Sequence, residues 1–249
     1  MAYQPIVNPV RQEIVAYEAL VRTREPSLPH PGAMFSVAER LGRVHEVGRA
    51  IRTSVAGLLS ERRPEHDIFL NLHPLDLLDE RLFAADAPIT AFSQQVVLEV
   101  TERATLDRVH DVAGRIRTLR GLGYRVAVDD LGAGYAGLNY FATLSPDVVK
   151  IDMALVRNLH LDAVRRRIVG SLCTLCKGLG MLVVAEGVEL AEEAAVATEL
   201  GCDLLQGFLF ARPDVAFPRV TWAPGLRDSV SVPALGRWGS GGGDASGLG

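Results

Sequence analysis

The sequence predicts an α/β fold of the TIM type, a (β/α)8 barrel, allowing for one irregular or antiparallel strand near the N-terminus. Three observations lead to this prediction. The chain has 249 residues, a length that a single barrel of this kind commonly occupies. Short runs rich in Val, Ile and Leu alternate with longer amphipathic segments. Each short run ends on a polar residue, and barrel active sites lie at such strand ends.

The short apolar runs are predicted to be strands. They are nearly continuous in Val, Ile and Leu, which is typical of parallel strands buried on both faces. They cover residues 14–20, 67–72, 95–100, 124–130, 147–152, 181–186 and 203–209. A further, weaker strand is predicted at 3–7, where Pro5 favours an edge or irregular position because it lacks a backbone donor.

The segments between these runs show the 3–4 spacing of apolar residues that predicts helices. They cover residues 33–41, 46–59, 106–119, 164–179 and 190–200, and the long interval before residue 67 leaves room for two helices. Gly123 and Gly180 follow predicted helices and suit left-handed caps. An open, doubly wound sheet is the alternative fold, but the G-x-G-x-x-G turn that it commonly carries is absent.

The domain organisation follows from a change in composition near the C-terminus. Residues 1–222 are expected to form the barrel domain. Residues 223–249 end in SGGGDASGLG and show no apolar periodicity, so we expect a flexible Gly/Ser-rich tail.

Composition and charge exclude several classes of protein. Hydrophobic residues make up 48% and charged residues 22%, which argues against disorder over most of the chain. The formal charge of −4 gives no general attraction to DNA or to an anionic membrane, so neither is expected as a partner. No apolar run approaches the roughly 20 residues that span a bilayer, and Met1–Asn8 does not begin a signal peptide.

The chain contains three cysteines, which fits a reducing compartment and a cytoplasmic location. Cys173 and Cys176 form a C-x-x-C pattern inside a predicted helix. Because this spacing places both on one helix face, we interpret them as small buried side chains rather than as a redox pair.

Polar residues stand at the ends of successive predicted strands. They are Glu18, Asn71, Glu99, Asp129 with Asp130, Lys150 with Asp152, Glu186 and Gln206. In a barrel these side chains would converge on the C-terminal mouth. Carboxylates so crowded repel one another, and a single lysine does not compensate for them.

Divalent cations are the natural partners for such a cluster. Carboxylate and amide oxygens without Cys or His favour Mg²⁺, Mn²⁺ or Ca²⁺ over Zn²⁺. The adjacent pair Asp129–Asp130 suits two neighbouring metals, an arrangement used for phosphodiester hydrolysis. Sugar enolisation or aldol chemistry on a barrel fits the same spacing, so the residues alone leave these alternatives open.

At these positions the sequence resembles the EAL-domain family of cyclic-di-GMP phosphodiesterases. The matching segments occur in family order between residues 3 and 213. They are YQPIV (3–7), YEALVR (17–22), FLNLHP (69–74), LEVTER (98–103), VAVDDLGAGYAGLNY (126–140), DVVKID (147–152), VVAEGVE (183–189) and LLQGFLFARP (204–213). The resemblance implies metal-dependent hydrolysis of cyclic-di-GMP to linear pGpG, with two Mg²⁺ or Mn²⁺ ions per active site.

The resemblance also implies roles for individual residues. Metal ligands would be Glu18, Asn71, Glu99 and Asp129, with Asp130 serving the second metal. Glu186 would act as the general base or position the water, Lys150 would contact the water and the phosphate, and Glu102 would anchor the loop after Asp130. Substrate contacts or their support would come from Gln4, Leu20, Arg22 (at a phosphate), Asp152, Glu189 and Gln206 (near the metals).

Two features separate this chain from the family pattern. The loop after Asp130 reads LGAGYAGL, where the family commonly carries hydroxyl side chains, and this difference bears on catalytic rate or regulation. His73 stands where smaller residues are common, and we interpret it as a hydrogen-bonded turn residue. The resemblance implies a homodimer through the region after Asp130. The alternative function is a weak or inactive module that binds cyclic-di-GMP or a protein.

Overall fold

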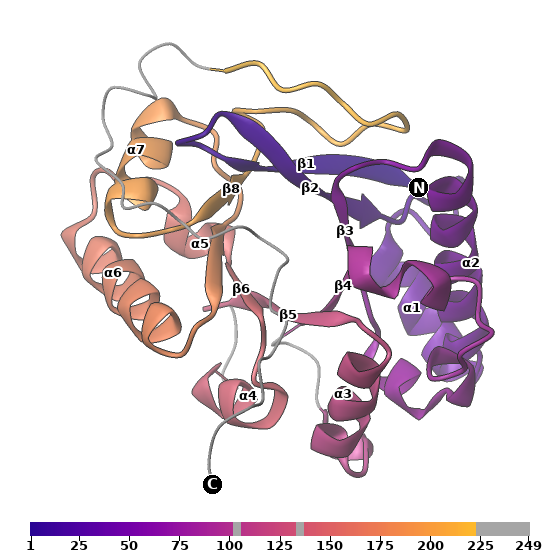
Figure 1. The fold of residues 1–249 in the computed structure, drawn as a ribbon. Coiled ribbons are helices and arrows are strands. Elements are labelled where there is room, and N and C mark those ends of the chain that lie inside the picture. Colours follow the sequence, from indigo (N-terminus) through magenta and orange to yellow (C-terminus); the bar gives the residue numbers. More distant parts are fainter. Residues whose placement is uncertain (102–105, 133–136, 223–249) are drawn as a thin grey trace, which may run out of the picture.

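The computed structural model describes residues 1–101, 106–132 and 137–222, and within them it shows a closed barrel of strands in the order β1 to β8 (Figure 1). The strands are β1 (Ala2–Asn8), β2 (Glu13–Leu20), β3 (Asp67–Asn71), β4 (Val96–Thr101), β5 (Arg125–Leu131), β6 (Val148–Ile151), β7 (Leu182–Ala185) and β8 (Leu204–Gln206). All the strands predicted from apolar runs are therefore present. The barrel prediction is confirmed.

Strand β1 closes the barrel in the antiparallel direction. It pairs with β2 on one side and with β8 on the other, whereas β2 to β8 pair in parallel. All of β1 is buried, so the expectation of an edge position for Pro5 was wrong. The expectation of irregularity was correct, because the register with β2 shifts between Ile6 and Val7.

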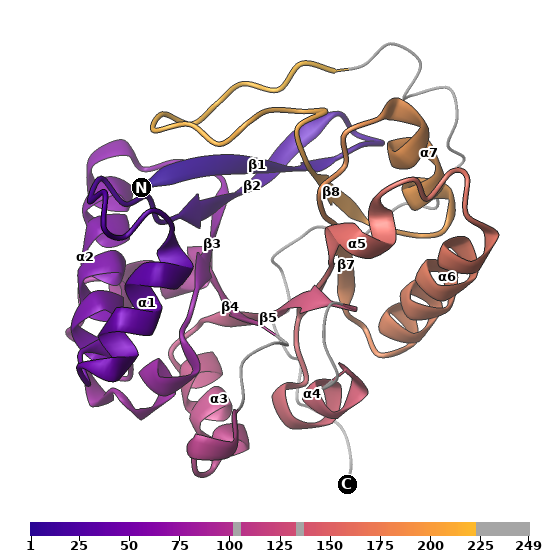
Figure 2. The same ribbon diagram turned by 180° about the vertical axis from the view of Figure 1, so that it is seen from behind.

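Helices cover the outside of the barrel (Figures 1 and 2). They are α1 (Pro31–Arg40), α2 (Val44–Arg62), α3 (Val112–Gly121), α4 (Gly137–Leu144), α5 (Met153–Val156), α6 (Ala163–Gly178) and α7 (Ala191–Glu199). Two helices, α1 and α2, fill the long interval between β2 and β3, as predicted. The predicted helix 106–119 was too long, because Leu106–Arg108 forms a separate 3-10 turn (η4) and α3 begins only after the left-handed cap Asp111.

The short connectors were not predicted from the sequence. After β3 the chain forms the 3-10 turns η1 (Pro74–Leu78), η2 (Glu80–Leu82) and η3 (Thr90–Gln95) before it enters β4. Such turns carry too few residues to show a periodicity.

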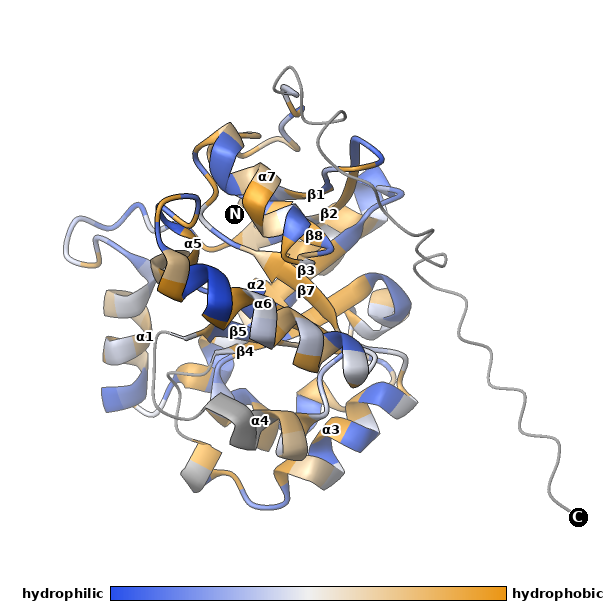
Figure 3. Ribbon diagram, turned by 90° about the vertical axis from the view of Figure 1, so that its left-hand side faces the viewer, coloured by the Kyte–Doolittle hydropathy of each residue, from blue (hydrophilic) through white to orange (hydrophobic). Residues whose placement is uncertain are grey.

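One layer of apolar side chains fills the bottom of the barrel. Each strand contributes one fully or almost fully buried member, namely Ile6, Ala16, Phe69, Val97, Ala127, Val148, Val184 and Leu204. Two larger apolar clusters lie between the strands and the covering helices. In Figure 3 the strands β3 and β7, at the centre of the molecule, carry the orange colour of hydrophobic residues.

Two predictions concern segments outside the described residues. They are the flexible tail at 223–249 and the altered loop, whose residues 133–136 are likewise not described. Among the described residues, every helix is too short or too polar to cross a bilayer.

Candidate active site

A ring of polar residues lies directly above the apolar layer inside the barrel. Side chains two positions apart on a strand point to the same face. Moving two residues toward the mouth from each member of the apolar layer gives Gln4, Glu18, Asn71, Glu99, Asp129, Lys150, Glu186 and Gln206. Gln4 precedes its apolar partner in the chain because β1 runs antiparallel. The predicted convergence of the strand-end residues is therefore present.

Lys150 is the centre of this ring. Its ammonium Nζ lies 2.7 Å from Glu99 Oε1 and 2.7 Å from Glu186 Oε1. It lies 3.4 Å from Asp129 Oδ1 and 3.5 Å from Glu18 Oε2. The Lys150 side chain is fully buried. One ammonium group thus faces four carboxyl groups in a buried place.

Amide side chains hold the Glu18 carboxylate from two sides. Asn71 Nδ2 donates to Glu18 Oε1 at 2.9 Å, and Gln206 Nε2 donates to Glu18 Oε2 at 2.6 Å. The Gln206 amide also donates to Gln4 Oε1 at 3.2 Å, and Gln4 Nε2 donates to the carbonyl of Ala211. A chain of hydrogen bonds therefore fixes Glu18 and leaves the amide oxygen of Asn71 available as a ligand.

The protonation of these carboxylates depends on burial and on their neighbours. Burial, together with the charges of Asp129 and Glu18, raises the pKa of both Glu99 and Glu186 well above the usual value for Glu. Burial alone would also raise the pKa of Glu18, but Lys150 and the two amide donors outweigh it and lower that pKa. Burial would lower the pKa of Lys150, but the surrounding carboxylates raise it well above its usual value.

A group of carboxylates suited to a metal ion opens toward the mouth. Oxygens of Asp129, Asp130 and Glu186 all lie within 4.8 Å of one another. Asp130 adopts a left-handed backbone with φ 59°, and Thr101 Oγ1 lies 3.4 Å from Asp130 Oδ2. The left-handed backbone lets consecutive residues present their carboxylates to the same place, which an extended strand would not allow.

The donor atoms fit divalent cations. Glu99 Oε2 is buried and accepts no hydrogen bond from any described residue. Such an oxygen normally has a partner, and a cation supplies one. The ligand set around it consists only of carboxylate and amide oxygens, which suits Mg²⁺, Mn²⁺ or Ca²⁺.

A cavity of about 250 Å³ opens beside this cluster. Its wall includes several predicted site residues, namely Gln4, Glu18, Leu20, Asp130, Asp152, Glu186, Glu189 and Gln206. Asp152 caps α5 by accepting a hydrogen bond from the Ala154 amide, and Glu189 forms an ion pair with Arg157. Arg22 is exposed, donates to the carbonyl of Val21 and does not line this cavity. Glu102 lies outside the described residues.

Further residues near the cluster were not predicted from the sequence. Met153, Arg157 and Phe208 line the cavity, and Thr101 contacts Asp130. Thr101 lies two positions after Glu99 on β4, so the period of the strand could have indicated it. Arg157 and Phe208 lie beyond strand ends, where no periodicity points to the mouth.

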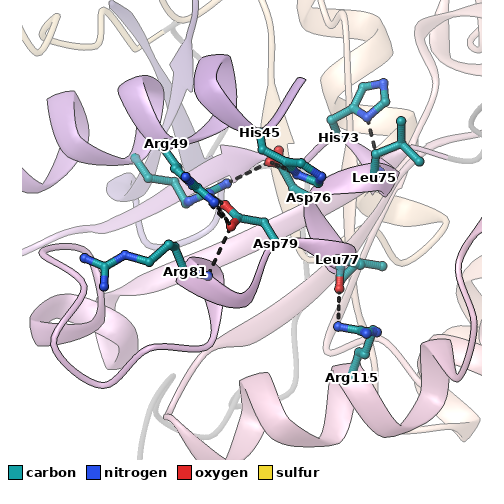
Figure 4. Close-up of polar contacts among 10 residues, drawn as sticks. His45, Arg49, His73, Leu75, Asp76, Leu77, Asp79, Arg81 and Arg115 are labelled. Atoms are coloured by element: carbon teal, nitrogen blue, oxygen red, sulfur yellow. Dashed lines mark hydrogen bonds and ion pairs between the residues drawn. The ribbon is translucent and has the colours of Figure 1, made fainter. Parts of the chain in front are cut away.

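A second group of acidic residues lies outside the barrel and is neutralised by arginines (Figure 4). Asp76 and Asp79 follow β3, and Arg52 of α2 lies 3.2 Å from Asp76 Oδ1 and 2.7 Å from Asp79 Oδ2. Arg49 adds bonds to both oxygens of Asp79. His45 also lies nearby, but the guanidinium groups already balance the two carboxylates. We therefore interpret this group as a brace between α2 and the connector after β3.

His73 belongs to the same connector and is a turn residue, as predicted. Its Nδ1 accepts a hydrogen bond from the Leu75 amide at the start of η1 (Figure 4). Its Nε2 lies 2.8 Å from Glu39 Oε1, and its ring stacks on Phe35 of α1. The acceptor role of Nδ1 assigns the proton of a neutral ring to Nε2.

Comparisons with known proteins give a consistent result. The model of the family described as "EAL domain" matches residues 1–213. The cyclic di-GMP phosphodiesterase PdeR of Escherichia coli is 31% identical over 87% of this chain and 34% of its own length. The calcium and cyclic-di-GMP complex of BlrP1 from Klebsiella pneumoniae is 33% identical with a TM-score of 0.76, covering 86% of this chain and 55% of that one.

A further solved structure matches over nearly all of its length. It is the cyclic-di-GMP-bound form of a standalone EAL protein from Vibrio cholerae, 33% identical with a TM-score of 0.73, covering 91% of this chain and 96% of that one. The curated relatives are longer. The chain spans 56%, 30% and 28% of the length of the first three that match.

Proposed function

The chain belongs to the EAL domain family, and from this premise we propose that it is a cyclic-di-GMP phosphodiesterase that produces linear pGpG. The observation that carries the proposal is the ring of carboxylates at the barrel mouth, held around Lys150 and bordered by an open cavity. Relatives bind the same nucleotide, as the descriptions of their solved complexes state. The proposal includes a requirement for two Mg²⁺ or Mn²⁺ ions and a cytoplasmic location.

The residues that would hold the metals are Glu18, Asn71, Glu99 and Asp129, with Asp130 at the second metal. Bound dications would neutralise phosphate charge and lower the pKa of a water molecule. Manganese and calcium complexes of BlrP1 support the use of a divalent cation. The choice between Mg²⁺ and Mn²⁺ and the number of ions are part of the proposal.

The chain's own groups would then position and activate the attacking water. Glu186 lines the cavity, and its raised pKa brings it closer to the working range of a general base. Lys150 lies 2.7 Å from both the Glu186 and Glu99 carboxylates and would provide a fixed positive charge for the reacting phosphate. Gln206 fixes the orientation of Glu18 through a short hydrogen bond.

The remaining assignments concern the substrate. Gln4, Leu20, Asp152 and Glu189 line the cavity and would contact the nucleotide or support groups that do. Arg22 is exposed two residues after Leu20, which lines the cavity, and would pair with a phosphate in a bidentate manner after a change of rotamer. Glu102 would anchor the loop after Asp130.

We also propose a homodimer through the region after Asp130. The outer surface of α6 exposes apolar side chains at Val164, Ile168 and Leu175, and Leu179 follows directly. At the C-terminal end of α6, Leu175 and Leu179 line a cavity of about 490 Å³ together with Phe141 of α4. Contiguous apolar surface of this kind is typical of protein interfaces.

The proposal is tested with purified protein, cyclic-di-GMP and Mg²⁺ or Mn²⁺. Hydrolysis to pGpG is expected, and Glu18→Ala should abolish it because it removes a carboxylate on which Asn71 and Gln206 converge. Equal turnover by this variant would refute the assignment. Tight nucleotide binding without product after long incubation with metal would instead favour the alternative, a receptor or protein-interaction module. Size-exclusion chromatography with light scattering tests the dimer.

A further inference from the structure

Cys173 and Cys176 are buried side chains of α6, as predicted. All three cysteines are free and buried. Cys173 lies on α6, and its Sγ is 3.7 Å from the Sγ of Cys202, which lies in the turn between α7 and β8. From this geometry we propose that Cys173 and Cys202 form a dithiol that hydrogen peroxide oxidises to a disulfide.

The turn that carries Cys202 is packed tightly against α6. The preceding residue, Gly201, has φ +106°, and a Cβ added there would lie 3.4 Å from the Cys173 Cβ and 3.1 Å from Lys177 Nζ. Glycine therefore allows the close approach that brings the two sulfurs together. A disulfide bond is about 2.05 Å long, so the sulfurs must move together by less than 2 Å, a change of the size that χ1 rotations supply.

The surroundings favour Cys173 as the thiol that reacts first. The hydrogen bond with Cys202 and the nearby Lys177 ammonium lower the pKa of Cys173, although burial opposes them. The thiolate is the nucleophile toward peroxide, so a lowered pKa increases reactivity. Burial raises the pKa of Cys176 to about 12, which keeps that neighbouring thiol protonated and makes it a suitable internal control.

The reaction balances with peroxide as the oxidant. The Cys173 thiolate attacks one peroxide oxygen, the O–O bond breaks, and the released hydroxide takes up a proton to give water and a Cys173 sulfenic acid. The Cys202 sulfur then attacks the sulfenic sulfur, an S–S bond forms, and the S–O bond breaks. The departing hydroxide takes the Cys202 proton and leaves as water. In sum, two thiols and one peroxide give one disulfide and two waters.

The crosslink would join α6 to the start of β8. The residue after Cys202 is the buried Asp203, whose carboxylate accepts a hydrogen bond from the Val183 amide of β7 at 2.9 Å. Three residues after Asp203, Gln206 ends strand β8. This proposal concerns the thiols alone and does not depend on the phosphodiesterase assignment.

The test uses the full chain, prepared reduced and then treated with hydrogen peroxide. Intact mass spectrometry should show the loss of two hydrogens, and peptide mapping without reductant should join the peptides that contain Cys173 and Cys202. A thiol reductant should reverse both changes. Cys176→Ser should still form the crosslink, whereas Cys173→Ser and Cys202→Ser should not.

Mapping of the unmutated chain keeps the proposal falsifiable even where a variant fails to fold. A Cys173–Cys176 crosslink, or oxygen addition at the thiols without any crosslink, would overturn it. So would a crosslink that forms only after the protein unfolds, which circular dichroism on the same samples detects.

Discussion

Replacing Lys150 tests most directly whether its positive charge stabilises the buried carboxylates of the site. Lys150→Met keeps a side chain of similar length, with an apolar stem, but removes the ammonium group. Among the described residues, this ammonium is the only one within 3.5 Å of the four carboxyl groups, those of Glu18, Glu99, Asp129 and Glu186. Breaking a buried ion pair by removing one partner costs about 3–5 kcal/mol, because the remaining charges stay buried without compensation. We expect a loss of this size in metal-free buffer at pH 8.

Urea unfolding followed by circular dichroism measures the effect. If the free energy of unfolding falls by about 2 kcal/mol per molar urea, the urea concentration at the unfolding midpoint should decrease by about 1.5–2.5 M. Millimolar Mn²⁺ should recover part of the loss, since a bound dication replaces the missing positive charge. The matched control is Lys177→Met, the half-exposed lysine 3.8 Å from Asp203, for which a change of at most about 1 kcal/mol is expected. Equal midpoints for Lys150→Met and the unmutated chain, or equal losses for the two variants, would refute the reasoning.

Two further predictions follow from the structure. Burial and neighbouring carboxylates raise the pKa of Glu99 and Glu186 in the folded protein above the ordinary value of 4.5. The folded state therefore binds protons at these two groups more tightly than the unfolded chain does. This proton binding stabilises the folded protein fully below pH 4.5, and the stabilisation is lost as the pH rises through the folded-state pKa. The metal-free protein should therefore lose stability in urea as the pH rises above about 4.5, and saturating Mn²⁺ should flatten this dependence; a metal-free stability that rises with pH over that range would contradict it. In α2, Gly48→Ala would place a Cβ 2.2 Å from Asp76 Oδ1, so it should lower the thermal midpoint, whereas Gly57→Ala meets no atom within 4 Å and should raise stability by up to about 1 kcal/mol. Differential scanning calorimetry compares the two variants, and a stable Gly48→Ala would mean that the contact with Asp76 relaxes freely.

The sequence alone was sufficient for the fold class and for the convergence of the strand-end residues at the barrel mouth. Apolar runs that end on polar residues predict the strands and also the polar groups at the mouth. The reason is that side chains two positions apart on a strand point to the same face. Phe69 and Asn71, or Val97 and Glu99, occupy successive layers of the barrel for this reason alone. This regularity depends only on neighbouring residues, so it can be read without knowledge of the tertiary structure.

Other features depend on contacts between residues far apart in the chain, and only the tertiary structure decided them. The sequence allowed for an antiparallel strand near the N-terminus and placed Lys150 with the carboxylates at the barrel mouth, but only the structure shows that β1 is that strand and that the Lys150 ammonium lies 2.7 Å from both Glu99 and Glu186. The spacing of the cysteines suggested Cys173 and Cys176 as the pair to consider, whereas the packing of α6 against the turn before β8 brings Cys173 to Cys202. Local periodicity fixes which face a side chain occupies, but the identity of its neighbour is set by how the elements pack.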